Sequence, residues 1–174
     1  DFPWHSLLGQ DEIPVQLHTL TGQVKYQAGA YQGTLNGDLN GPAGPFSVTS
    51  AFDGDLQQVQ LSELLVEAGQ GRLQGNASVA FADGVGWLAD IQASKLDPSY
   101  WVAELPGELA GNIHSQGVLR DGQLQVEATA DLNGKLRGSL TQLVIDLQGE
   151  QQEQATAVWQ LKRADLRFGD NTIV

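Results

Sequence analysis

The sequence predicts an all-β fold in which antiparallel strands follow one another along the chain, with one short helix among them. Three observations predict this class. Apolar and polar residues alternate with a period of two, which gives a strand one apolar and one polar face. Turn-forming pairs separate the alternating runs, and 21 of the 174 residues are glycine. The spacing of these turns, about 8–12 residues, predicts about ten to twelve strands.

The alternation is clearest between Leu124 and Leu132, where every second residue, Ala128 and Ala130 included, is apolar and all the residues between them are polar or charged. Further strands with this pattern are expected at 46–52, 73–81, 85–93 and 143–147. Leu140 and Leu143 are out of phase by one residue, so a β-bulge is expected near Thr141-Gln142. Hairpin turns are expected at five pairs: Asp53-Gly54, Asp83-Gly84, Asp121-Gly122, Asn133-Gly134 and Gly169-Asp170.

One segment has the signals of a helix. Asp97 can act as the N-cap, Pro98 suits the first helical position, and Pro106 would end the helix. Trp101 and Leu105 would then lie on one face, four residues apart. We expect a short helix over 98–105, packed against the sheet.

Glycine also recurs inside the strand patterns, in the form Leu-x-Gly. It occurs, for example, at Leu73–Gly75, Leu109–Gly111 and Leu132–Gly134. In a strand these two residues share a face, so the glycine leaves a notch beside the leucine or permits a bend. Repeated notches would curl a sheet. Ordinary bulges in a β-sandwich explain the same pattern equally well.

Composition and charge argue against several classes of function. Asp and Glu number 21 against 9 Lys and Arg, for a net charge of −12, so the chain lacks the cations that a nucleic-acid binder needs. An anionic membrane surface would also repel it. No apolar stretch reaches the length of a membrane-spanning helix. The absence of cysteine excludes disulfides, thiol catalysis and cysteine-based zinc sites.

The motifs of catalysis and metal binding are not found. His5, His18 and His114 lie too far apart in the sequence to form a typical metal motif, and a structural role is expected for the last two. Asp53-Gly54-Asp55 lacks the remaining ligand positions of a calcium loop, so it is interpreted as a turn. Nucleophile-elbow, phosphate-loop and dinucleotide fingerprints are absent from the sequence. We therefore expect no enzyme, no catalytic residues, no metal and no cofactor.

The segment from Trp87 to Gly117 carries a more specific pattern. A strand ends in Leu96-Asp97-Pro98, the aromatic pair Tyr100-Trp101 follows, and Leu105-Pro106-Gly107 opens the next strand. This order resembles the TamB family of the AsmA-like superfamily. The resemblance covers about residues 57–149, and in the first 45 residues only the alternation supports it.

The resemblance implies that residues 1–174 form a single segment of an elongated β-groove array, interior to a longer protein. Residues 1–14 are expected to be poorly ordered, because they include Pro3 and Pro14 and no cation precedes Lys25. Proteins of this family are thought to cross the periplasm of Gram-negative bacteria as a sheet curled into a U, or β-taco. The parent protein would be anchored in the inner membrane. The family is implicated in moving phospholipids to the outer membrane and, with the outer-membrane barrel TamA, in assembling outer-membrane proteins such as autotransporters.

We therefore expect a monomer whose apolar groove holds phospholipid acyl chains, with a TamA-like barrel as a partner of the parent protein and no nucleic acid. A protein-binding scaffold or chaperone for outer-membrane β-barrel clients is the alternative, and a closed β-sandwich without ligand is a third. The residues expected to line the groove are apolar positions of the strand patterns: Leu73, Val79, Phe81, Val85, Trp87, Ile91, Leu109, Ile113, Leu124, Val126, Leu136, Leu140, Ile145 and Leu147.

Overall fold

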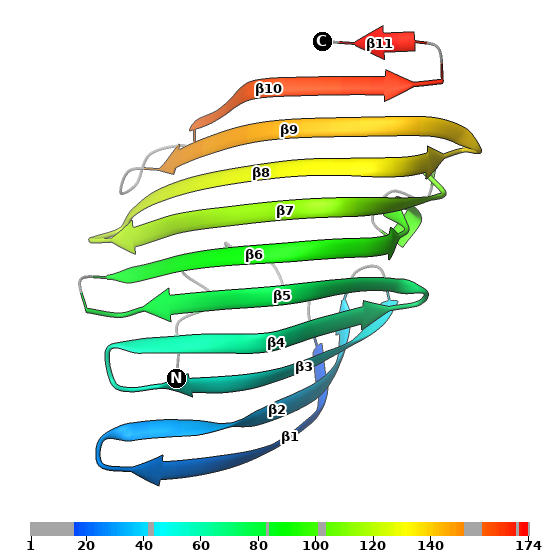
Figure 1. Ribbon diagram of the computed structural model, residues 1–174. Helices are drawn as coiled ribbons and strands as arrows, with labels where there is room; N and C mark the ends of the chain where they lie inside the picture. Colours follow the sequence, from blue (N-terminus) through cyan, green and yellow to red (C-terminus); the bar gives the residue numbers. More distant parts are fainter. Residues whose placement is uncertain are drawn as a thin grey trace.

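The computed structural model describes residues 16–41, 44–82, 84–100, 104–151, 158–169 and 171–173, so the expectation for 1–14 lies outside the described residues. The described strands form one 11-stranded antiparallel sheet, in which each strand pairs with the next along the chain (Figure 1). The all-β class and the antiparallel arrangement are confirmed. The strands are β1 (Gln16–Gln27), β2 (Ala30–Gly41), β3 (Gly44–Gly54), β4 (Gln58–Ala68), β5 (Gly71–Ala80), β6 (Val85–Leu96), β7 (Gly107–Arg120), β8 (Gln123–Leu136), β9 (Ser139–Gln151), β10 (Val158–Phe168) and β11 (Asn171–Ile173).

The sheet is twisted and open, and it is neither closed nor strongly curled, so the expected U-shaped curl is not present in this segment (Figure 1). The positions of the glycines give a physical reason. Gly111 lies opposite Ala93 on one side and Leu132 on the other, and Gly134 lies opposite Leu109 and Thr141. Because these notches do not line up across neighbouring strands, they do not form a hinge line along which the sheet could fold over.

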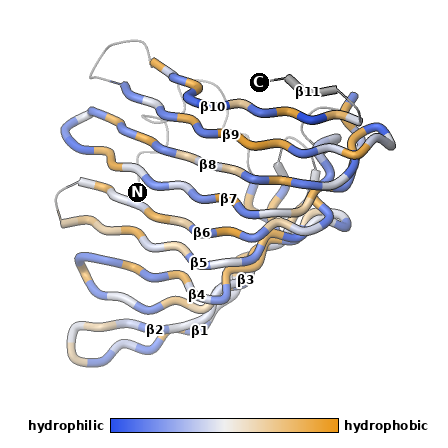
Figure 2. The backbone as a smooth tube through the Cα atoms, turned by 45° about the horizontal axis from the view of Figure 1, so that its top comes forward, coloured by the Kyte–Doolittle hydropathy of each residue, from blue (hydrophilic) through white to orange (hydrophobic). Residues whose placement is uncertain are grey.

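The register sorts the side chains into two faces, because residues directly opposite each other in an antiparallel pair lie on the same face. We call the apolar face the one that carries Leu109 and Leu132, and the polar face the one that carries Asp90, His114 and Asp146. Figure 2 shows the hydrophobic and hydrophilic residues that alternate along the strands. The buried core, formed by Ala93, Leu109 and Leu132, lies on the apolar face, and six partly buried side chains pack against it: Leu73, Leu96, Ile113, Ala130, Leu136 and Leu143.

The helix expected over 98–105 is not formed in the described part of that segment, which has only a 3-10 turn, η1 (Pro98–Tyr100). Residues 101–103 lie outside the described residues. The Asp97 carboxylate accepts a hydrogen bond from the Ser99 backbone N–H at 3.0 Å, as a cap would. It also accepts one from the Gly107 N–H at 3.1 Å, at the start of β7. One side chain thus joins both ends of the loop, which favours a short link over a continuing helix.

Three further expectations were wrong. Asp53-Gly54 is the end of β3, paired with Gln60 and Val59, and the turn follows at 55–57. Asn133-Gly134 lies inside β8, and the turn falls at Arg137-Gly138, where both residues have the positive φ (50° and 81°) of a type I′ turn. No bulge occurs at Thr141-Gln142, because the β8–β9 register runs without a shift through both residues.

Bulges occur elsewhere, and two of them place a residue other than glycine at positive φ: Glu63 at 53° in β4 and Lys95 at 51° in β6. Each bulge adds one residue to its strand, so the apolar positions shift from odd to even numbers, or the reverse, beyond the bulge. The apolar side chains on both sides of the bulge therefore stay on one face. In β4, Leu61 and Leu64 share the apolar face although they are three positions apart in the sequence.

Candidate functional site

The apolar face extends from β1 to β10, and no second sheet packs on it among the strands that the structure describes. Its burial is greatest near the β6–β7 connection, where Leu109 is 2% exposed. Toward the two edges of the sheet the same face is open, with Tyr26 on β1 73% exposed and Trp159 on β10 55% exposed. A large apolar surface of this kind is a feature of sites that bind an apolar partner.

The register places nearly all of the residues predicted to line the groove on this face. On β5 and β6 these are Leu73, Val79, Val85, Trp87 and Ile91; on β7 and β8 they are Leu109, Ile113, Leu124, Val126 and Leu136; on β9 they are Ile145 and Leu147. Phe81 comes directly after β5, where its N–H donates to the Gln57 carbonyl at 2.7 Å.

Leu140 is the exception. It lies opposite Lys135 on the polar face and is 69% exposed. The expectation assumed a bulge between Leu140 and Leu143. Since that bulge is absent, Leu143 is the residue that packs against the buried core. A one-residue difference in phase reverses the face of a side chain.

Aromatic rings on the apolar face lie against glycines of the neighbouring strand. A Cβ placed on Gly149 would overlap the ring of Trp159, and one on Gly117 would overlap the ring of Trp87. The Trp87 indole N–H donates to the Ser115 hydroxyl at 3.2 Å, which holds that ring across β7. The glycines thus let the rings lie along the sheet, as in the pairing of aromatic residues with strand glycines.

Sequence reasoning missed Trp159, Gly117 and Phe52 as members of this surface. Phe52 lies against Gly33 in the same way, with a ring atom 2.8 Å from the position of an added Cβ. The alternation at 46–52 already indicated Phe52. No such signal identified Trp159, because a register shift between Leu161 and Arg163 breaks the alternation in β10.

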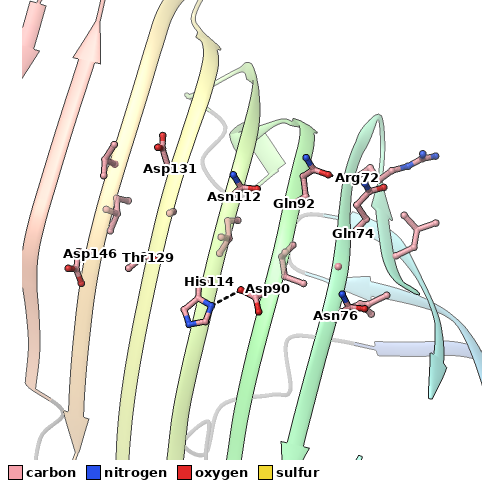
Figure 3. A pocket seen from close by; sticks show the side chains of 18 of the residues that line it. Arg72, Gln74, Asn76, Asp90, Gln92, Asn112, His114, Thr129, Asp131 and Asp146 are labelled. Atoms are coloured by element: carbon pink, nitrogen blue, oxygen red, sulfur yellow. Dashed lines mark hydrogen bonds and ion pairs between the residues drawn. The ribbon is translucent and has the colours of Figure 1, made fainter. Parts of the chain in front are cut away.

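The polar face has a shallow hollow of about 1030 Å³ across β4 to β10 (Figure 3). Its side chains pair across strands: Gln74 donates to Gln92 at 3.1 Å, and His114 Nδ1 lies 2.8 Å from an Asp90 carboxylate oxygen. Within the described part of the chain, no three side chains of His, Asp or Glu converge to hold a metal ion. These cross-strand pairs are those of a solvated sheet surface.

Asp97 is the one described ionisable group whose pKa clearly differs from its usual value. The hydrogen bond from the Ser99 backbone N–H is the main cause that lowers the pKa of Asp97 below its usual value, and the Gly107 N–H acts in the same direction. Asp97 is half-buried, and its role in the structure is to hold the loop between β6 and β7.

The fold and the apolar face define a class of protein: an open antiparallel meander that presents one continuous apolar surface. The family model described as "TamB, N-terminal domain" matches residues 6–174, and the chain belongs to this family. The match extends well beyond the stretch of about 57–149 in which the sequence motifs lie.

The chain is similar to the translocation and assembly module subunit TamB of Haemophilus influenzae, with 26% identity over 163 residues. The aligned region is 91% of this chain and 12% of the relative, so the chain spans about an eighth of the relative's length. No solved structure matches it. In the described ranges, no helix has the length and apolar character needed to cross a membrane.

Proposed function

We propose that this chain is a periplasmic segment of a TamB-like bridge protein whose apolar face conducts phospholipids between the inner and outer membranes. The observation that carries the proposal is the continuous apolar face from β1 to β10, open toward both edges of the sheet. The parent protein would be anchored in the inner membrane, and the chain would act without catalysis or a cofactor.

The physical argument concerns what covers this face. Apolar side chains without a second layer remain in water, and acyl chains that bind there remove both surfaces from water. Each buried methylene contributes on the order of 0.8 kcal/mol. A chain that moves from one strand to the next exchanges similar contacts, so no single position binds it tightly. Movement of this kind requires neither a reacting group nor a pocket of fixed shape.

A role in the translocation and assembly module follows from the family and from the name of the H. influenzae relative. We propose that the parent protein works with a TamA-like outer-membrane barrel and supports the assembly of outer-membrane proteins such as autotransporters. This chain would contribute as a monomer and would not bind nucleic acid, consistent with its net charge of −12.

Photo-crosslinking in living cells tests the lipid proposal. A crosslinking amino acid at Trp87 or Val126 lies on the apolar face, and one at Gln125 is the matched control, because Gln125 neighbours Val126 and lies on the polar face. We expect phospholipid adducts at the first two positions and none at Gln125. Equal lipid adducts on both faces, or only protein adducts on the apolar face, would overturn the proposal.

A second candidate function is supported by the edge of the sheet. β1 pairs with β2 alone, so the other edge of this 12-residue strand has free backbone groups within the described structure. An extended client segment could add there as a further strand. This would make the chain a scaffold or chaperone for outer-membrane β-barrel clients. Crosslinkers on the polar side of β1, at Thr21 and Gln23, would then capture protein in place of lipid.

A further inference from the structure

The Trp and Tyr residues of the apolar face lie in one row. All the tryptophans and tyrosines whose side chains the structure describes, Tyr26, Tyr31, Trp87 and Trp159, belong to it. In the strand pairing, the positions between these aromatic residues in the row are glycine or valine. The row runs Tyr26, Tyr31, Gly54, Val59, Val79, Trp87, Gly117, Val126, Gly149 and Trp159, one residue from each strand from β1 to β10.

The rest of the apolar face has a different composition. The described rows toward the β6–β7 connection contain mainly Leu, Ile, Val and Ala with small or hydroxyl residues and no Trp or Tyr, and they include the buried core at Ala93, Leu109 and Leu132. The described phenylalanines of the strands, Phe46, Phe52 and Phe168, all lie outside the Trp and Tyr row. The aromatic residues that carry a polar atom are therefore confined to one row, which is separated along the strand direction from the buried core, although Phe52 in the next row contacts Tyr31 with the ring centroids 6.2 Å apart.

This separation matches the two ends of a phospholipid. Trp and Tyr combine a large apolar ring with a polar atom, and they concentrate where hydrocarbon meets water or lipid headgroups. We propose that the row Tyr26, Tyr31, Trp87 and Trp159 binds the glycerol-ester region of a phospholipid, and that the acyl chains extend along the strands toward Ala93 and Leu132. The inference rests on the proposed function and specifies the orientation of the lipid on the face.

The dimensions fit this orientation. Along β6, Ile91 is four residues from Trp87 and Ala93 is six, which at about 3.3 Å per residue gives about 13 and 20 Å. The hydrocarbon part of one leaflet is about half of the ~30 Å bilayer core, or ~15 Å. An acyl chain whose ester lies at Trp87 would therefore end between these two residues, at the edge of the buried core.

Tryptophan fluorescence can measure the orientation in the purified full chain. In one variant, Trp4 and Trp101 are replaced by Phe and Trp159 by Tyr, which leaves Trp87 as the only tryptophan. In the matched variant Trp87 and Trp159 are replaced by Tyr, which keeps a ring with a polar atom in the row, Trp4 and Trp101 are replaced by Phe, and Ile113→Trp is added. Ile113 lies on the same face in the row of Ile91. Each protein is loaded from phosphatidylcholine vesicles whose chains carry bromine near the ester or near the methyl end, and the vesicles are then removed.

We expect bromine near the ester to quench Trp87 more than bromine near the methyl end, with the opposite order for the Ile113→Trp protein. Equal quenching by both lipids, or the reverse order, would overturn the orientation while leaving lipid binding intact. No quenching by either lipid would contradict the proposed function itself, and the orientation with it. Circular dichroism and thermal unfolding check that both variants keep the fold of the parent chain.

A substitution series tests whether the row causes the orientation. In the protein that carries Ile113→Trp, all four positions of the row, 26, 31, 87 and 159, are changed to Leu. Leucine keeps the face apolar but removes the polar atoms. We expect the amount of bound lipid to stay the same and the difference between the two brominated lipids to disappear. A difference that persists would assign the orientation to another part of the face.

Discussion

At the scale of single residues, glycines determine where large side chains can lie on the apolar face. Gly149 leaves room for the Trp159 ring, and a Cβ on Gly75 would overlap the backbone carbonyl oxygen of Asp90. These are two kinds of constraint. A Cβ added at Gly149 meets a side chain that can rotate away. A Cβ added at Gly75 meets backbone that the β5–β6 ladder holds in place. Substitution at Gly75 should therefore cost more stability than substitution at Gly149.

Gly149→Ala should lower the free energy of unfolding by about 1–3 kcal/mol, the usual cost of adding atoms to a packed site. The same change in a Trp159→Leu background should cost less, because the clashing ring is gone, with a coupling of about 0.5–3 kcal/mol. Denaturant unfolding of the four proteins measures this. Gly86→Ala is the control, since an added Cβ there meets only the Gly117 carbonyl oxygen at 3.8 Å. Additive effects would show that Gly149 does not act through Trp159.

Val126→Asp should abolish the lipid adducts at Trp87 while the sheet stays folded. Val126 is half-buried on the apolar face between Gly117 and Gly149, so a carboxylate there interrupts the apolar surface but still reaches water. A destabilisation of about 0.5–3 kcal/mol is expected, as for most single substitutions. Crosslinking yield and circular dichroism are measured together, with Gln125→Asp as the control. Loss of the fold would instead assign Val126 to a closed core.

At the scale of elements, the connection between β6 and β7 depends on one carboxylate. Asp97 joins Ser99 at the start of η1 to Gly107 at the start of β7, and the Arg137 N–H donates to the Pro106 carbonyl at 2.8 Å. These bonds fasten the loop beside the buried core at Leu109. The loop therefore contributes to the most protected part of the apolar face.

The pKa of Asp97 gives this contact a defined pH dependence. Because the pKa in the folded state is lowered below 3.8, the stabilisation is fully present above the unfolded-state pKa and is lost as the pH falls through the folded-state value. Asp97→Asn should lower the melting temperature at pH 7. The difference between the two proteins should shrink as the pH falls below about 3.8. A difference that is the same at pH 7 and at acidic pH would contradict a role for the charged form.

At the scale of the whole molecule, the sheet formed by the described strands is open at both edges and apolar on one face. The lipid proposal uses the face, whereas the scaffold alternative uses the β1 edge, so the two can be separated by changes confined to that edge. Thr21 and Gln23 lie on the polar side of β1 and contribute nothing to the apolar face. Lysine at the edge of a sheet opposes the addition of another strand.

Thr21→Lys with Gln23→Lys should leave the yield of lipid adducts at Val126 unchanged. Both side chains are exposed, so the stability of the sheet should change by less than about 0.5 kcal/mol. Crosslinking at Val126 in cells is the measurement, with unaltered β1 as the reference. A fall in lipid adducts would mean that the β1 edge is part of the lipid path, and a fall in protein adducts alone would support the scaffold function.

The alternation of apolar and polar residues was enough to predict the all-β class and most of the apolar face. This follows from a covalent property of strands, in which successive side chains point to opposite sides. Leu124 and Val126 could be placed together without knowledge of any partner strand. The Leu96-Asp97-Pro98 and Leu105-Pro106-Gly107 elements were likewise enough to indicate the family to which the chain belongs.

Tertiary structure decided what depends on the pairing between strands. A bulge reverses the phase of the alternation, so only the register shows that Leu140 lies on the polar face and that Trp159 lies on the apolar one. The absence of a strong curl also depends on which residues oppose the glycines. The row of Trp and Tyr across the sheet exists only because hairpins and bulges bring distant residues into line, and local sequence carries no information about that alignment.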